Sequence, residues 1–233
     1  MKNIVILTGS GISAESGIST FRGGDGLWDG HRIEDVATPE AFERDPDLVQ
    51  SFYNTRRAQL ATVKPNPAHA ALVALENAWQ GEFLLVTQNV DDLHERAGSK
   101  KLIHMHGELK KARCLETGQV YDWQGALTQD TVCACCQREG MLRPHIVWFG
   151  EMPLAMEHIY HALRKADIFL SIGTSGLVYP AAGFVQEVRR NNRNCRTVEI
   201  NLEPTAGRSY FAESVYGKAG EVLPGFVQQL LND

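Results

Sequence analysis

The feature that most constrains the fold of this chain is a set of four short apolar runs, each ending in small or polar residues. The runs are rich in aliphatic and β-branched side chains and do not alternate with polar ones, which is typical of strands buried on both faces of a parallel sheet. They cover residues 4–9, 83–89, 168–175 and 197–203. Helical patterns lie between the runs, so the sequence predicts an open α/β sheet with helices on both faces.

Proline residues that follow a capping residue mark the starts of two predicted helices. Asn66 precedes Pro67 and Asp45 precedes Pro46, which is the pattern of a capped helix with proline in its first turn. The remaining helical patterns cover residues 153–166, 180–192 and 224–231. We therefore expect helices in each of the connections between the predicted strands.

Two stretches interrupt the alternation of strands and helices. Residues 21–62 contain a glycine-rich loop and then a helix, and residues 107–143 contain most of the cysteines. We expect both stretches to be insertions that form a small lobe on a single domain covering residues 1–233. The larger lobe would then comprise about residues 1–20, 63–106 and 144–233, which suits a chain of this length.

The charge balance and the length of the apolar runs exclude several classes of partner. The chain has 23 Lys and Arg against 28 Asp and Glu, a net charge of −5, whereas nucleic acids and anionic membranes bind basic faces. The apolar runs have the length of strands and fall far short of the roughly 20 residues that span a bilayer. We expect no nucleic-acid or membrane partner, and a monomer.

A glycine-rich turn follows the first predicted strand. Residues 9–14 fit the pattern G-x-G-x-x-A, in which Gly9 would permit the tight turn, Gly11 the approach of a pyrophosphate and Ala14 close contact between helix and sheet. The alternative is a plain turn between a strand and a helix. A dehydrogenase would continue to a second strand ending in an acidic residue roughly 20 positions on, but here a loop continues to residue 26. Hydride transfer is therefore disfavoured.

Polar side chains follow the predicted strands, where open α/β sheets bind their ligands. Asn89 and Asp91 would suit a carboxamide or ribose hydroxyls, although helix capping would also explain them. Alternation places His104 and His106 on one side of a short apolar segment, and Gly107 would leave room beside His106. His106 is thus a candidate catalytic residue, the alternative being a hydrogen-bonded structural histidine.

On these residues the chain resembles the sirtuin family, and most closely the bacterial members of its class III branch. The matching motifs span nearly the whole chain in family order, at residues 9–22, 87–91, 104–107, 173–175 and 201–203. The resemblance implies a Rossmann-like lobe plus a small lobe with a helical and a zinc module. It also implies removal of acyl groups from lysine with consumption of NAD, releasing nicotinamide and O-acyl-ADP-ribose.

The resemblance assigns roles to individual residues. His106 would be the general base, Asn89 and Asp91 would hold the nicotinamide carboxamide and ribose, and Phe21 would shield the reactive carbon. The glycine-rich turn would cradle the pyrophosphate, and the strand ends after residue 172 would bind adenosine. The implied NAD-binding residues are Gly9, Ser10, Gly11, Ile12, Ser13, Ala14, Glu15, Phe21, Arg22, Trp28, Gln88, Asn89, Val90, Asp91, Gly173, Thr174, Ser175, Asn201, Leu202, Glu203 and Ala219.

Tyr53 and Arg56 are candidates for an acyl pocket. Residues three apart share a helix face, and a guanidinium beside a phenol suits a carboxylate. The alternative is a core tyrosine beside a surface arginine whose stem packs on the protein. The resemblance to class III sirtuins implies that the pair binds the acidic end of succinyl- or malonyl-lysine, while acetyl would also fit.

The segment of residues 147–151 resembles the strand with which sirtuins pair an extended substrate peptide, and the alternative is an ordinary aromatic core strand. Backbone pairing makes few demands on side chains, so we expect acyl-lysine proteins of broad sequence as partners. The substrate-binding residues implied here are Val147, Phe149 and Gly150.

Four of the five cysteines lie between residues 114 and 136, which favours metal ligation in a reducing cytoplasm over secreted disulfides. Two C-x-x-C pairs would be a strong zinc signal, but Thr117 stands where the second ligand is expected. We predict a structural zinc ion on Cys114, Cys133 and Cys136, with Cys135 as a possible fourth ligand. A metal-free lobe or a redox-sensitive thiol cluster is the alternative.

Overall fold

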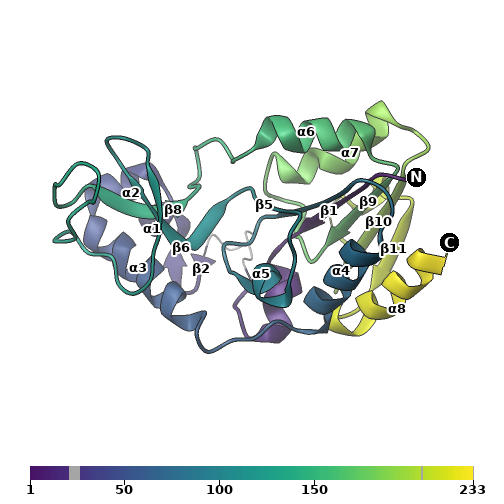
Figure 1. The fold of residues 1–233 in the computed structure, drawn as a ribbon, viewed down its shortest axis with the longest axis horizontal. Helices are drawn as coiled ribbons and strands as arrows, with labels where there is room; N and C mark the ends of the chain where they lie inside the picture. Colours follow the sequence, from purple (N-terminus) through teal and green to yellow (C-terminus); the bar gives the residue numbers. More distant parts are fainter. Residues whose placement is uncertain (21–26, 206, 233) are drawn as a thin grey trace.

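The computed structural model describes residues 1–20, 27–205 and 207–232 (Figure 1), so Phe21 and Arg22 lie outside the described residues. Its largest sheet has six parallel strands in the order β11-β10-β9-β1-β4-β5. These strands are β1 (Ile4–Thr8), β4 (Phe83–Thr87), β5 (Leu102–His104), β9 (Ile168–Ile172), β10 (Arg196–Asn201) and β11 (Glu213–Tyr216). The four predicted runs therefore form the four central strands.

Both faces of this sheet are covered by helices, as Figure 1 shows. Ile4 and Ile6 of β1 pack with α4 (Pro67–Ala78) and α8 (Ala219–Asn232), whereas Val5 and Leu7 pack with α6 (Met156–Lys165) and α7 (Phe184–Asn191). Successive residues of a strand point to opposite faces, so burial of both faces requires apolar residues at every position. The predicted two-layer cover of the sheet is confirmed.

The small lobe lies at the left of Figure 1, and the six-stranded sheet lies at the right. Its three-stranded antiparallel sheet has the order β7-β6-β8, and three helices pack beside it. Its elements are α1 (Ile33–Val36), α2 (Pro39–Arg44), α3 (Pro46–Gln59), β6 (Gly107–Cys114), β7 (Val120–Asp122) and β8 (Leu142–Ile146). Phe52 of α3 packs with Leu109 of β6 and with Trp148 in a separate core. The predicted boundary after residue 143 therefore falls inside β8.

A two-stranded hairpin precedes α1 in a region that sequence reasoning took for a glycine-rich loop. Its strands are β2 (Leu27–Trp28) and β3 (His31–Arg32). The turn residues Asp29 and Gly30 have φ of 50° and 79°. Positive φ at both central residues defines a type I′ turn, whose twist matches that of the flanking strands, and Asp-Gly is a favoured sequence for this turn. The dipeptide was thus a usable signal for this hairpin.

Helices start where a capping residue precedes proline, but not where proline alone predicts a start. Asn66 Oδ1 accepts from the Ala68 N–H and Asp45 Oδ1 from the Leu48 N–H, as the cap pattern predicts. By contrast, α8 starts five residues before Pro224, α6 starts at Met156, and α7 follows a 3₁₀ turn.

The remaining elements are 3₁₀ turns at Ser10–Ser16, Ala181–Gly183 and Arg208–Tyr210, and α5 (Leu93–Ala97). No helix in the described ranges has the length and apolar content to cross a bilayer.

Candidate active site

A cavity of about 220 Å³ lies between the carboxyl ends of the large sheet and the small lobe. Both lobes contribute side chains to it, which is the position expected for a ligand site in an open α/β sheet. The predicted site residues that line it are Gly9, Ser10, Trp28, Tyr53, Arg56, Gln88, Asn89, Val90, Asp91, His106, Val147, Phe149, Gly150, Thr174 and Ser175. The structure thus brings His106, the Tyr53–Arg56 pair and part of the predicted cofactor-binding set into one cavity. On the glycine-rich turn, the predicted residues outside the lining are Gly11, Ile12, Ser13, Ala14 and Glu15.

The glycines of the turn after β1 pack against the end of β9. A Cβ on Gly11 would lie 2.7 Å from the Cα of Gly173, and a Cβ on Gly9 would lie 2.8 Å from the Gly173 carbonyl oxygen. The Gly11 N–H also donates to that carbonyl at 2.8 Å. These glycines therefore let two strand ends approach each other. The structure gives Gly11 this packing role, and its contact with a pyrophosphate stays a prediction.

The 3₁₀ turn also differs from the predicted helix in what it buries. Ala14 is exposed, so the predicted contact of Ala14 with the sheet is wrong, and Ile12 and Ser13 are the buried residues. The Glu15 carboxylate accepts from the Gly220 N–H at 2.7 Å, in the first turn of α8. Glu15 thus links the turn to the C-terminal helix.

A buried polar network ties Asn89 and Asp91 to the turn. Asn89 Nδ2 donates to Ser13 Oγ at 3.1 Å, and Ser13 Oγ donates to Asp91 Oδ2 at 3.0 Å. Burial raises the pKa of Asp91, which hydrogen bonds from Leu93 and Ser13 partly offset. Leu93 is the first residue of α5, so Asp91 also serves the helix start that was the alternative explanation. Both side chains are therefore held in place at the cavity wall.

His106 lines the cavity with one ring nitrogen already engaged. Its Nδ1 lies 3.2 Å from the Gln88 carbonyl oxygen, which can only accept, so a neutral ring carries its proton on Nδ1 and a lone pair on Nε2. Burial lowers the pKa of His106, and the Gln88 carbonyl offsets this in part. Gln88 is itself fixed, since its Nε2 donates to Thr174 Oγ1 at 3.0 Å. The ring is therefore neutral near physiological pH and able to accept a proton at Nε2.

Gly107 has a different use from the one predicted. Its φ is +83°, and a Cβ there would lie 2.0 Å from the His145 carbonyl oxygen of β8. Only glycine fits such a position, because an L side chain would meet the neighbouring backbone. Gly107 thus makes room for β8.

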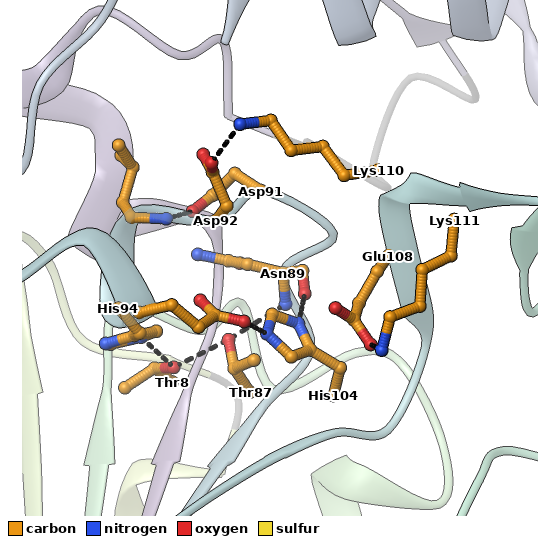
Figure 2. A network of polar contacts seen from close by, with 12 residues as sticks. Thr8, Thr87, Asn89, Asp91, Asp92, His94, His104, Glu108, Lys110 and Lys111 are labelled. Atoms are coloured by element: carbon orange, nitrogen blue, oxygen red, sulfur yellow. Dashed lines mark hydrogen bonds and ion pairs between the residues drawn. The ribbon is translucent and has the colours of Figure 1, made fainter. Parts of the chain in front are cut away.

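His104, two residues before His106, does not line the cavity. Figure 2 shows its ring beside Asn89. Its Nδ1 lies 2.9 Å from the Asn89 carbonyl oxygen and its Nε2 lies 2.6 Å from a Glu95 carboxylate oxygen, so the charged ring can donate to both. Burial disfavours the charged ring, but the hydrogen bond and charge of Glu95 raise the pKa of His104 above its ordinary value. The pKa values of the two histidines are therefore shifted in opposite directions, and only His106 of the pair lines the cavity.

Tyr53 and Arg56, the residues predicted for an acyl pocket, are both buried. Trp148 Nε1 donates to the Tyr53 hydroxyl at 3.0 Å, and burial raises the pKa of Tyr53, which therefore stays a neutral phenol. Arg56 is only 7% exposed, so the alternative of a surface arginine is wrong. Its Nη1 donates to the Phe52 carbonyl at 3.1 Å and its Nη2 to Asp29 Oδ2 at 2.5 Å. Burial lowers the pKa of Arg56, and Asp29 opposes this.

Comparison with known proteins identifies the family of this site. The model of the Sir2 family matches residues 9–180, a range that includes the glycine-rich turn, Asn89, Asp91 and His106. The chain belongs to the Sir2 family. The sirtuin resemblance predicted from the motifs is confirmed.

Individual Sir2 relatives align over nearly the whole chain. The NAD-dependent protein deacylase of Escherichia coli (strain K12) is 60% identical over 230 residues, which are 98% of this chain and 82% of that protein. A Sir2 homologue solved with NAD has a TM-score of 0.88 at 40% identity, over 98% of this chain and 89% of that one. Sir2Tm bound to a propionylated peptide has a TM-score of 0.80 at 28% identity, over 99% and 92%. The predicted fold is confirmed by these likenesses.

The predicted adenosine end of this Sir2 protein is only partly in the cavity. Asn201 Nδ2 donates to the Thr174 carbonyl at 2.9 Å, which joins the ends of β9 and β10. Thr174 and Ser175 line the cavity, whereas five other predicted residues of this end lie outside its lining, namely Gly173, Asn201, Leu202, Glu203 and Ala219. Leu202 is 61% exposed, so this end opens to solvent.

The segment predicted to pair with a substrate peptide is not a strand in the Sir2 structure, because β8 ends at Ile146. The Val147 N–H donates to the His106 carbonyl and the Phe149 N–H to the Ala37 carbonyl, each at 2.9 Å. Phe149 is 43% exposed at the cavity rim. The segment therefore connects the two lobes directly beside His106.

All four clustered cysteines meet in the small lobe. The Sγ atoms of Cys114, Cys133, Cys135 and Cys136 lie within 4.8 Å of one another, with 3.9 Å between Cys114 and Cys136 and 3.4 Å between Cys133 and Cys135. A tetrahedral zinc site with Zn–S bonds of about 2.3 Å places its sulfurs roughly 3.8 Å apart. The four thiols therefore fit zinc, and Cys135 joins the three ligands that the sequence favoured.

Proposed function

We propose that this Sir2 protein is an NAD-dependent protein-lysine deacylase that accepts acetyl and acidic acyl groups. The observation that carries this proposal is that His106, the Asn89–Asp91 network and the Tyr53–Arg56 pair all line one cavity. The relative from E. coli is named as an NAD-dependent protein deacylase, and Sir2Tm was solved with a propionylated peptide. A proton acceptor, a nucleotide site and an acyl pocket in one place suit this reaction.

The residues at the strand ends would hold NAD. Bound NAD supplies a carbon that loses nicotinamide and takes up the acyl oxygen. Asn89 and Asp91 offer an amide and a carboxylate to the polar groups of the ligand, and Ser13 fixes both of them. Ser10 and Thr174 face the cavity on the side of the glycine-rich turn. Buried polar groups that are already fixed lose little entropy when they bind a ligand.

His106 would move the proton. Its Nε2 can accept a proton while Nδ1 stays bonded to the Gln88 carbonyl, and that carbonyl stabilises the charged ring that results. On the other side of the cavity, the neutral Tyr53 hydroxyl can donate to an acyl oxygen, and Arg56 carries the positive charge for an acyl carboxylate.

Activity should stay constant through neutral pH and fall only below pH 6.5. The neutral form of His106 is needed as the base, and burial lowers its pKa below the ordinary 6.5, so the base persists to lower pH than a free imidazole would. A profile of kcat/KM for one succinyl-lysine peptide between about pH 5 and 9 measures this. An acid limb centred above 6.5 would contradict the assignment.

The direct test of the function is incubation with NAD and succinyl-lysine peptide. We expect deacylated peptide and free nicotinamide in equal amounts by mass spectrometry. If neither product forms, the proposal is wrong. If ADP-ribose becomes attached to protein, the activity is ADP-ribosyl transfer. The same peptide with acetyl, succinyl and malonyl groups ranks the acyl preference.

We also propose that the four cysteines hold a structural zinc ion, because no step assigned to His106 requires a Lewis acid. Zinc bound by four thiolates stabilises a small module whose own core is small. Cys135→Ser should lower the zinc content after dialysis against a chelator from about one ion per chain to less than half of that. Cys195→Ser, which changes a buried cysteine outside the cluster, should retain the metal. Wild-type protein without zinc would contradict this proposal.

A further inference from the structure

Arg56 is the only arginine or lysine among the described residues that line the cavity. Its guanidinium carbon lies 3.4 Å from the centre of the Phe52 ring and 4.9 Å from that of Trp28. A charge held among aromatic rings away from water needs a compensating charge close by. The cavity therefore has one cationic position, and an acyl carboxylate that enters must use it.

That position is already taken by a carboxylate of the chain itself. Asp29 Oδ2 accepts from Arg56 Nη2 at 2.5 Å, while the side chain of Asp29 is 35% exposed and that of Arg56 only 8%. Asp29 lies on the two-residue turn of the β2–β3 hairpin, and that sheet contains no other strand among the described residues. Asp29 is thus the more easily moved partner of the pair.

From this ion pair we propose that Asp29 is a specificity-determining residue, an internal carboxylate that competes with acidic acyl groups for Arg56. The inference rests on the proposed function. An acidic acyl group must displace Asp29, because two carboxylates beside one guanidinium repel each other. A neutral acyl group enters with the pair intact. The preference between acidic and neutral acyl groups is then a difference of two binding free energies. Asp29 weakens the binding of acidic acyl groups and leaves the binding of neutral ones unchanged.

The test is Asp29→Asn, which removes the charge and keeps the shape. Asparagine tolerates positive φ, and Asn-Gly is as good a turn sequence as Asp-Gly, so the hairpin is preserved. We expect the ratio of kcat/KM for succinyl-lysine over acetyl-lysine peptide to rise about three- to tenfold, mainly through a lower KM for the succinyl peptide. In an Arg56→Met background the same substitution should leave the ratio where Arg56→Met alone puts it.

The matched control is Asp35→Asn, which removes a carboxylate of the same lobe that pairs with Arg44 outside the cavity. It should leave the ratio unchanged. An unchanged or lower ratio in Asp29→Asn, with succinyl removal still dependent on Arg56, overturns the role of Asp29 alone. Wild-type protein without any Arg56-dependent removal of succinyl overturns the inference together with the acidic-acyl part of the proposed function.

Discussion

Replacing His106 with alanine should lower kcat about 10²- to 10⁴-fold on both acetyl- and succinyl-lysine peptides, the usual contribution of a positioned general base. Alanine cannot accept the proton, and no other histidine lines the cavity among the described residues. Binding should suffer less than turnover, because the residues proposed to hold NAD and the acyl group are unchanged. Steady-state kinetics with saturating NAD measure both effects.

The control for this substitution is His161→Ala, an exposed position on α6 outside the cavity. It should retain wild-type rates. Because His106 is mostly buried, thermal unfolding of the alanine variant should be followed as well, so that a fold defect is separated from a lost base. A folded His106→Ala protein that keeps more than about a tenth of the wild-type rate would show that His106 is not the base.

Arg56→Met should weaken the handling of succinyl-lysine by about 1.5–3 kcal/mol, or roughly 10- to 150-fold in kcat/KM, and affect acetyl-lysine much less. The lost interaction is a hydrogen bond between charged groups in a cavity partly closed to water. Methionine can occupy the apolar space beside Phe52 without a charge that would need a partner. The comparison requires the same peptide sequence with the two acyl groups.

Arg44→Met is the matched control, because Arg44 is an exposed arginine of the same lobe that pairs with Asp35 outside the cavity. It should leave both substrates at wild-type efficiency. Equal losses on the two substrates in Arg56→Met would instead mean that Arg56 supports the small lobe. The acidic-acyl pocket would then be wrong, and the deacylase proposal would stand on His106 and the nucleotide residues.

The central strands were predictable because each is buried on both faces, and such burial leaves an uninterrupted apolar run. The edge strands β5 and β11 are less buried and carry no long apolar run. The sequence indicates only a short apolar segment at β5, which was not assigned to the sheet, and no strand at β11. In the same way, Pro224 suggested a helix start, but α8 begins at Ala219. Local sequence patterns thus identify the strands that are buried on both faces. They do not identify edge strands or helix starts that depend on packing against other elements.

For the site, residue types and spacing made His106, Asn89, Asp91 and the Tyr53–Arg56 pair candidates, and the resemblance to the sirtuin family supplied their expected roles. The glycines were recognised, but their partners were not, since Gly11 meets Gly173 and Gly107 meets the backbone of β8. A glycine in a sequence shows that something approaches the backbone and does not say what approaches. The ion pair of Arg56 with Asp29 was missed for a related reason, because it depends on where a hairpin folds back.

The sequence by itself determined the parallel sheet, the family and the kinds of group available for chemistry, because periodicity and residue type are local properties of the chain. Only the tertiary structure decided which carboxylate faces Arg56, that Cys135 meets the other three thiols, and that one cavity joins the two lobes. These facts depend on contacts between segments far apart in the chain. Such contacts are fixed by the packing of the whole molecule and leave no pattern in the short stretches that form them.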